Sequence, residues 1–191
     1  MEPEKLLLVG TTLAIVTVGV LFGASLLTLP TSSNQSSDDS DLTKTTVDTD
    51  LISLGLQVPA GWEFEMSDGS TLDLDDLRGT VIVVDLMATW CSSCATQNGY
   101  LLDLYDIAAG PVEIVSLSVD SSDTAAMMAD YKQTKGLPWP HGLDTGRSFM
   151  NYFSVTNVPS LVIIDGDGYF RYFHVGLWTD AQMSQTIASV M

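Results

Sequence analysis

Two cysteines, separated by two serines, are the residues of this chain best suited to carry out chemistry. Cys91 and Cys94 are the only cysteines among its 191 residues. A disulfide that closes so short a loop adds little stability, because the entropic benefit of a cross-link grows with the length of the closed loop. A framework of structural disulfides is therefore excluded. We interpret the pair as a reactive dithiol that cycles with its disulfide.

The residues around the pair predict how it is positioned. Residues 81–87 form a β-branched, nearly continuous apolar run, typical of a central strand covered on both faces. Residues 93–108 carry apolar side chains at helical spacing. Cys91 would open this helix, where free N–H groups and the helix dipole stabilise a thiolate and lower the pKa of the thiol. Cys94 lies one turn further on, so we predict that Cys91 is the nucleophile and Cys94 the resolving thiol.

A CxxC pair can also be half of a metal site. Structural zinc normally needs four ligands, and the sequence has no second CxxC. His141 and His174 lie in segments without zinc-finger spacing, and we interpret them as ordinary strand and loop residues. The sequence therefore predicts neither a metal nor a cofactor. A copper-binding or assembly module, in which the two sulfurs hold Cu(I), stays as an alternative.

The remaining segments alternate between strands and helices. The predicted strands are residues 62–66, 71–72, 81–87, 113–119, 161–164 and 170–175, with a hairpin at each end of this series. The predicted helices are residues 93–108, residues 123–135 ending before Gly136, a short helix at 147–153, and a C-terminal helix that begins with a capping box at 179–182. This order predicts an α/β fold, with a central sheet flanked by helices on both faces.

The N-terminal region predicts a membrane anchor. Residues 6–29 contain no charged side chain, and about 24 residues of helix span a hydrocarbon core of about 30 Å. The apolar run is longer than that of a cleaved signal peptide and lacks its small-x-small site, so we expect an uncleaved signal anchor. Lys5 lies next to the run, which favours a cytoplasmic N-terminus and a catalytic domain outside the cytoplasm. We predict a transmembrane signal anchor at 1–30, a flexible acidic linker at 31–55 and the catalytic domain at 56–191.

Acidic residues dominate the charge of the chain. It contains 24 Asp and Glu against 7 Lys and Arg, a formal net charge of -17. A polyanion would be repelled, so no nucleic acid partner is expected. A solvated acidic surface is the simpler explanation of this charge.

The motifs together resemble the thioredoxin superfamily. The sequence WCSSC at 90–94 follows an apolar strand, and VPS stands far downstream at 158–160. The closer resemblance is to the TlpA-like branch, which includes the membrane-anchored reductants of cytochrome c maturation. It is carried by LDDLRG at 74–79 and ATWC at 88–91, and extends from about Val58 to the C-terminus. The resemblance implies a thioredoxin fold with a central mixed sheet and an N-terminal β-hairpin, here joined to one transmembrane helix.

The resemblance also implies roles for residues outside the CxxC pair. Pro159 matches the cis-proline beside the dithiol, which leaves the backbone of Val158 to pair with an extended substrate segment. Asp85 matches the buried acid that helps to ionise the resolving thiol, although an acid facing solvent at a strand end is the alternative. Trp90 would shield and position the dithiol next to the substrate, the alternative being a plain core residue.

The implied function is thiol-disulfide exchange with extracytoplasmic protein disulfides, as a reductant that receives electrons from a membrane thiol carrier. The expected location is the cell membrane, through a single span. Ser93 replaces a proline common in the family and Gln97 replaces a common glutamate, so the redox potential and direction stay open. A thiol peroxidase is a further alternative, but its Pro-x-x-x-Thr-x-x-Cys signature is absent, with Val84 and Ala88 at those positions.

Overall fold

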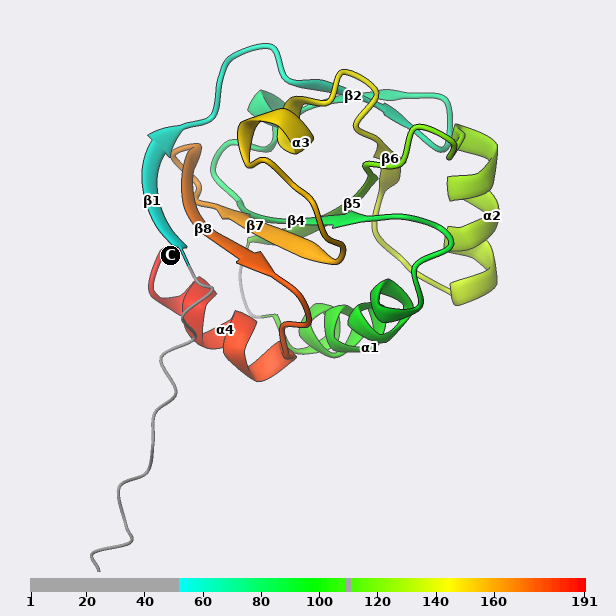
Figure 1. Cartoon of the computed structure of the whole chain (residues 1–191). Helices are drawn as coiled ribbons and strands as arrows, with labels where there is room; N and C mark the ends of the chain where they lie inside the picture. The colour runs from blue at the N-terminus through cyan, green and yellow to red at the C-terminus, as the bar shows by residue number, and fades with distance from the viewer. Residues whose placement is uncertain (1–51, 109–110) are drawn as a thin grey trace, which may run out of the picture. The chain divides into compact units, whose positions relative to one another are not determined.

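The computed structural model describes residues 52–108 and 111–191. They form one mixed sheet with helices on both faces (Figure 1). The strands are β1 (Ile52–Gln57), β2 (Glu63–Met66), β3 (Thr71–Asp73), β4 (Val81–Met87), β5 (Val112–Ser118), β6 (His141–Leu143), β7 (Ser160–Ile164) and β8 (Tyr169–Val175). The helices are the 3-10 helix η1 (Leu74–Leu77), α1 (Ser92–Ile107), α2 (Ala125–Lys135), α3 (Ser148–Tyr152) and α4 (Asp180–Ala188).

Strand β4 lies inside the sheet, whose order is β1-β8-β7-β4-β5-β6-β2-β3. It pairs in parallel with β5 and antiparallel with β7. All seven of its residues are buried, which agrees with the continuous apolar run in the sequence. Because Cys91 follows the end of β4, the dithiol is attached to a strand that is buried along its whole length.

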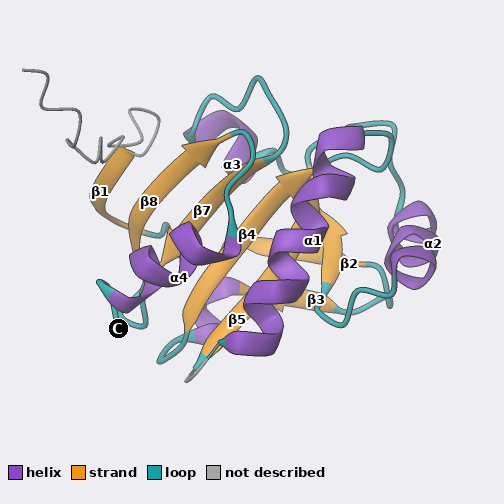
Figure 2. Cartoon of the chain, turned by 90° about the horizontal axis from the view of Figure 1, so that it is seen from below, coloured by secondary structure: helices purple, strands orange, loops and turns teal. Residues whose placement is uncertain are grey.

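Side chains of β4 alternate between two hydrophobic cores. Val83 and Met87 pack with residues of α1, α2 and α4 on one face. Val84 and Leu86 pack on the other face, with Phe149 of α3. Figure 2 shows α1 and α4 lying across the first of these faces. The predicted sheet with helices on both faces is therefore confirmed.

Two helix ends follow the signals in the sequence. Helix α2 is capped by Thr124, whose side chain accepts a hydrogen bond from the N–H of Met127 at 3.2 Å. It ends at Gly136, which has a φ of 66°, a left-handed conformation that glycine adopts without strain. Helix α4 begins with the predicted capping box between Thr179 and Gln182.

Two strands lie where the sequence predicted none. Strand β1 begins at Ile52, inside the range 31–55 assigned to the linker, and pairs antiparallel with β8. Strand β6 pairs with both β5 and β2. A Cβ added at Gly142 of β6 would lie 2.6 Å from the carbonyl oxygen of Glu65, so this close strand pairing needs a glycine. Both strands depend on partners distant in sequence.

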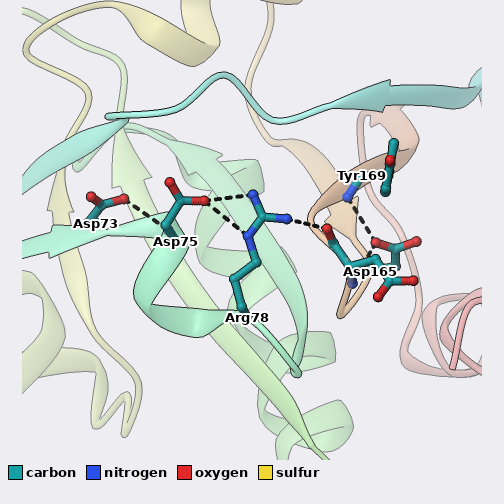
Figure 3. A network of polar contacts seen from close by, with 6 residues as sticks. Asp73, Asp75, Arg78, Asp165 and Tyr169 are labelled. Atoms are coloured by element: carbon teal, nitrogen blue, oxygen red, sulfur yellow. Dashed lines mark hydrogen bonds and ion pairs between the residues drawn. The ribbon is translucent and has the colours of Figure 1, made fainter.

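A cluster of polar side chains links two loops at the end of the sheet opposite the dithiol. Strands β2 and β3 pair antiparallel, and η1 follows β3. Arg78 donates hydrogen bonds to Asp75 Oδ1 from Nε at 3.0 Å and Nη2 at 2.7 Å (Figure 3). Its Nη1 donates to the carbonyl oxygen of Asp167, in the turn between β7 and β8. Because this cluster lies at the start of β4, we assign it a structural role.

The predicted transmembrane anchor at 1–30 lies outside the described residues. Among the helices of residues 52–108 and 111–191, none is both long and apolar enough to cross a membrane.

Candidate active site

Cys91 and Cys94 lie at the N-terminus of α1, where the sequence placed them. Cys91 is the N-cap residue, and its Sγ accepts a hydrogen bond from the N–H of Cys94 at 3.0 Å. The two sulfurs are joined in a disulfide, so the structure represents the oxidised state. Cys91 is 5% exposed and Cys94 is fully buried, which makes Cys91 the more accessible sulfur. In the reduced state the same N–H can stabilise a thiolate on Cys91.

The segment before β7 lies against this disulfide. The peptide bond between Val158 and Pro159 is cis. The carbonyl oxygen of Val158 lies 3.7 Å from Cys91 Sγ. Val158 precedes β7, so its backbone lies outside the β7 ladder and at the edge of the dithiol. The structure thus brings together Cys91, Val158 and Pro159.

Ser93 lies between the nucleophile and this segment. Its Oγ is 3.3 Å from Cys91 Sγ and donates a hydrogen bond to the carbonyl oxygen of Val158 at 3.4 Å. A serine hydroxyl has one hydrogen, which it can direct to either neighbour. When Cys91 becomes a thiolate, the hydroxyl of Ser93 gains a charged acceptor. The sequence indicated Ser93 only as a departure from the family pattern.

Trp90 is an exposed residue beside the dithiol. Its side chain is 68% exposed, so the alternative of a plain core residue does not hold. The indole Nε1 donates to Asp120 Oδ2 at 2.6 Å, which fixes the ring at the surface. Hydrogen bonds from the side chain and backbone of Ser122, followed by the one from Trp90, hold the pKa of Asp120 below its usual range.

Asp123 supports the loop that carries Trp90 and Cys91. Its carboxylate accepts hydrogen bonds from the N–H of Thr89 at 2.9 Å and from Thr89 Oγ1 at 2.5 Å. It also accepts a hydrogen bond from Ser118 Oγ at 2.6 Å, at the end of β5. One buried carboxylate therefore joins the active-site loop to the next strand. Sequence reasoning missed Asp123, because no local pattern links it to Thr89.

Asp85 is fully buried in β4. In a strand its side chain points to the same face as those of Val83 and Met87, which pack in the core that also contains Cys91 and Cys94. Burial raises the pKa of Asp85 to about 7, against a hydrogen bond from Ser116 Oγ to Oδ2 at 2.9 Å that lowers it. The alternative of a carboxylate facing solvent therefore does not hold.

Gln97 joins α1 to the segment before α4. The fully buried side chain donates from Nε2 to the carbonyl oxygen of Trp178 at 2.8 Å and accepts at Oε1 from the N–H of Trp178 at 2.8 Å. An amide satisfies both groups without a charge, whereas an ionised glutamate carboxylate has no hydrogen to donate. Glutamine at this position therefore suits the backbone of Trp178.

Both histidines are buried. His174 lies in β8, and its Nε2 is 3.0 Å from the carbonyl oxygen of Leu177. His141 lies in β6 and not in a loop as predicted, and its Nδ1 is 3.0 Å from the carbonyl oxygen of Trp139. Burial lowers the pKa of His141 to about 4, so its ring is neutral at pH 7. Within the described part of the chain, no three His, Cys, Asp or Glu side chains gather as a metal site.

A cleft of about 440 Å³ lies beside the dithiol and was not predicted from the sequence. Trp90 and Val158 belong to its lining, so it adjoins both segments that flank Cys91. Val119, Leu143 and Met150 contribute apolar surface. A cleft of this size next to a reactive sulfur can hold one or two side chains of a bound polypeptide.

The chain is similar in sequence to known thiol-disulfide oxidoreductases. The sequence profile of the Redoxin family matches residues 53–186. The chain is 28% identical over 139 residues to the thiol-disulfide oxidoreductase ResA of Bacillus anthracis, covering 71% of this chain and 78% of that protein. It is 26% identical over 133 residues to the protein of the same name from Bacillus subtilis strain 168, covering 69% and 73%.

Solved structures show the same fold. StoA from Bacillus subtilis aligns with a TM-score of 0.58 at 19% identity, covering 69% of this chain and 98% of that one. A thiol:disulfide interchange protein of the thioredoxin family from Chlorobium tepidum TLS aligns with a TM-score of 0.60 at 20% identity, covering 71% and 96%. These alignments confirm the thioredoxin fold that the resemblance implied.

Proposed function

The chain belongs to the Redoxin family and is a thioredoxin-like thiol-disulfide oxidoreductase, and on this premise we propose that it reduces disulfides of extracytoplasmic proteins. The observation that carries the proposal is the hydrogen bond of 3.0 Å from the N–H of Cys94 to Cys91 Sγ at the start of α1. This donor stabilises negative charge on the sulfur that is the more accessible of the two.

The reaction proceeds in two exchanges. The thiolate of Cys91 attacks one sulfur of the substrate disulfide, whose S–S bond breaks, and the other substrate sulfur leaves as a thiolate that takes up a proton. Asp85 accepts the proton of the Cys94 thiol, and the resulting thiolate attacks Cys91 Sγ. The mixed disulfide then breaks, the substrate leaves with two reduced cysteines, and the protein is left with the Cys91–Cys94 disulfide.

The substrate is proposed to bind across Val158 and the cleft. An extended segment can pair with the backbone of Val158, which lies beside Cys91 Sγ and outside the β7 ladder. Its side chains would enter the cleft between Trp90 and the apolar surface around Met150. This arrangement favours disulfides in extended or incompletely folded chains, because a compact substrate would keep its backbone away from Val158.

A reductant must itself be reduced in each cycle. We therefore propose a membrane thiol carrier that reduces the Cys91–Cys94 disulfide, as the family resemblance implies. Residues 6–29 would anchor the chain in the cell membrane with the dithiol outside the cytoplasm. A membrane-impermeant maleimide applied to intact, prereduced cells should then label Cys91, and labelling only after lysis would contradict this orientation.

The redox potential of the pair in the full-length chain tests the proposed direction. Equilibration against dithiothreitol or glutathione, followed by alkylation and mass measurement, gives this potential. A value below about −250 mV supports a reductant, and a value above about −150 mV contradicts it in favour of an oxidant. Stoichiometric Cu(I) binding without any disulfide exchange would contradict the proposed oxidoreductase activity and favour the copper-binding alternative.

Ser93 should contribute to this potential. Its hydroxyl can donate to the Cys91 thiolate, which exists only in the reduced form, so it favours reduction of the pair. A Ser93→Ala variant should have a potential lower by about 30 mV, the equivalent of one hydrogen bond to a charged group. Ser92→Ala, which changes the exposed neighbouring serine, is the matched control and should leave the potential unchanged. Equal potentials in the Ser93→Ala variant and the parent protein would contradict the role of this hydroxyl.

A further inference from the structure

A chain of hydrogen bonds ends on the buried acid. Trp139 Nε1 donates to Ser116 Oγ at 2.9 Å, and Ser116 Oγ lies 2.9 Å from Asp85 Oδ2. All three side chains are buried, with exposures of 2%, 0% and 0%. Asp85 and Ser116 are register partners in the parallel pair of β4 and β5, so their side chains point to the same face. The contact between them is thus fixed by the sheet.

The chemistry of the three groups fixes the direction of each hydrogen bond. An indole N–H is only a donor, so the Ser116 oxygen must accept from Trp139. The single hydrogen of the Ser116 hydroxyl is then directed to Asp85 Oδ2, the one acceptor that it meets among the described residues. This hydrogen bond occupies Oδ2 as an acceptor, whereas Oδ1 has no hydrogen-bond partner within residues 52–108 and 111–191. Oδ1 is therefore the oxygen that is free to take up a proton.

We propose that Ser116 and Trp139 are positioning residues that keep the proton of Asp85 on Oδ1, so that Oδ1 is the atom that exchanges a proton with Cys94. This inference rests on the role proposed above for Asp85. Asp85 points to the face of β4 whose core contains Cys94, and in the described part of the chain no hydrogen bond joins Oδ1 directly to Cys94 Sγ, so the proton passes through a bridging water. Oδ1 takes up this proton, and the electron pair left on Cys94 Sγ forms the new bond to Cys91 Sγ. The bond between Cys91 and the substrate sulfur breaks, and its electron pair leaves with the substrate.

The other groups around Asp85 do not change charge near neutral pH. Tyr131 of α2 has a raised pKa, chiefly because of burial, and its hydroxyl accepts a hydrogen bond from Asn98 Nδ2 at 2.8 Å. His141 of β6 is neutral, because burial lowers its pKa to about 4. The register partner of Asp85 on β7 is the apolar Leu161. With Cys94 of α1 held in the disulfide, a titration near pH 7 in this core therefore reports on Asp85.

The pKa of Asp85 in variants of the oxidised, full-length protein tests the inference. Carbon-13 NMR of labelled aspartate carboxyls measures it, and the signal is assigned by its absence in Asp85→Asn. Ser116→Ala removes the donor to the carboxylate and should raise the pKa of Asp85 by about one. Trp139→Phe lets the Ser116 hydroxyl turn away and should produce a smaller rise. Ser116→Thr keeps the hydroxyl and should restore the parent value.

A double-mutant cycle separates positioning from general structural damage. Because Trp139 acts through Ser116, Ser116→Ala combined with Trp139→Phe should give the same pKa as Ser116→Ala alone. The pH midpoint for release of a substrate from its mixed disulfide should rise together with this pKa. An unchanged pKa in Ser116→Ala, or additive effects of the two substitutions, would overturn the inference. If Ser116→Ala fails to fold, an unchanged pKa in Trp139→Phe overturns it as well.

This experiment distinguishes the inference from the proposed role of Asp85. The NMR titration uses the oxidised protein without substrate and reports only the pKa of Asp85, which depends on its hydrogen bonds. Normal substrate release in Asp85→Asn would refute proton transfer by Asp85, whatever the NMR result. An unchanged pKa of Asp85 in the Ser116 variants would refute the positioning role of Ser116, while proton transfer by Asp85 would still stand.

Discussion

Replacing Cys91 by serine should abolish disulfide exchange, with a loss of at least about 1000-fold in the rate of insulin reduction by the dithiothreitol-reduced protein. A serine hydroxyl ionises far less readily than a thiol, and an oxygen cannot form the mixed disulfide. The N–H of Cys94, which now points to the sulfur at 3.0 Å, would point to an unreactive hydroxyl. Turbidity of precipitating insulin, corrected for the rate with dithiothreitol alone, measures the loss.

Cys94→Ser is the matched control for this loss. It keeps the nucleophile but removes the resolving thiol, so the protein should accumulate one equivalent of mixed disulfide through Cys91. Mass measurement of the trapped adduct, followed by peptide mapping, identifies the attached residue. A Cys91→Ser protein that still reduces insulin, or an adduct attached through Cys94 in the parent protein, would contradict the assigned roles.

Replacing Asp85 by asparagine should remove the stability loss that ionisation of Asp85 causes in the parent protein as pH rises. Burial raises the pKa of Asp85 from 3.8 to about 7, so between these values the folded chain holds a proton that the unfolded chain has released. The parent protein therefore loses stability as pH rises from about 4 to about 7. The full difference corresponds to about 4 kcal/mol.

Urea unfolding of both proteins in the oxidised state at pH 4 and pH 8 measures this change. The free energy of unfolding of Asp85→Asn minus that of the parent protein should increase by about 4 kcal/mol from pH 4 to pH 8. Asp76→Asn, which changes an exposed carboxylate of η1, is the control and should show no such change. A difference that does not vary with pH would mean that burial does not raise the pKa of Asp85 in the folded protein.

The same substitution should slow the second exchange. Without a carboxylate to accept the proton of Cys94, release of substrate from the mixed disulfide should slow by about 100-fold near pH 7, within the range of general-base effects. The first exchange, which uses the Cys91 thiolate, should keep its rate. Stopped-flow measurement of the two phases with a fluorescent disulfide peptide separates these steps.

Much of the site could be predicted, because its signals are local in the sequence. The apolar run of β4 places Cys91 at the start of α1, and the two-residue spacing places Cys94 one turn further on. Gly136 and Thr179 marked helix ends that the structure confirms. The VPS motif indicated the segment beside the dithiol through family resemblance alone, since nothing in its spacing links it to Cys91.

The supporting residues could not be predicted, because their partners are distant in the chain. Asp123 is 34 positions from Thr89, and Ser116 is 31 positions from Asp85. Each contact depends on the parallel pairing of β4 with β5, whose register no local pattern shows. Strand β6 was missed for a similar reason, since its three residues are held between β5 and β2. The resemblance implied that Asp85 is buried, but not that Ser116 is its hydrogen-bond partner.

The most direct test of the account is the pH dependence of alkylation of the reduced, full-length protein. Iodoacetamide is applied briefly between pH 4 and pH 10, and mass spectrometry of peptides gives the labelling rate of each cysteine. The account predicts that Cys91 reacts first, with a midpoint below about 8.5, the value of an ordinary cysteine thiol. Faster labelling of Cys94, or a midpoint for Cys91 at or above the ordinary value, would contradict a thiolate stabilised at the N-terminus of α1.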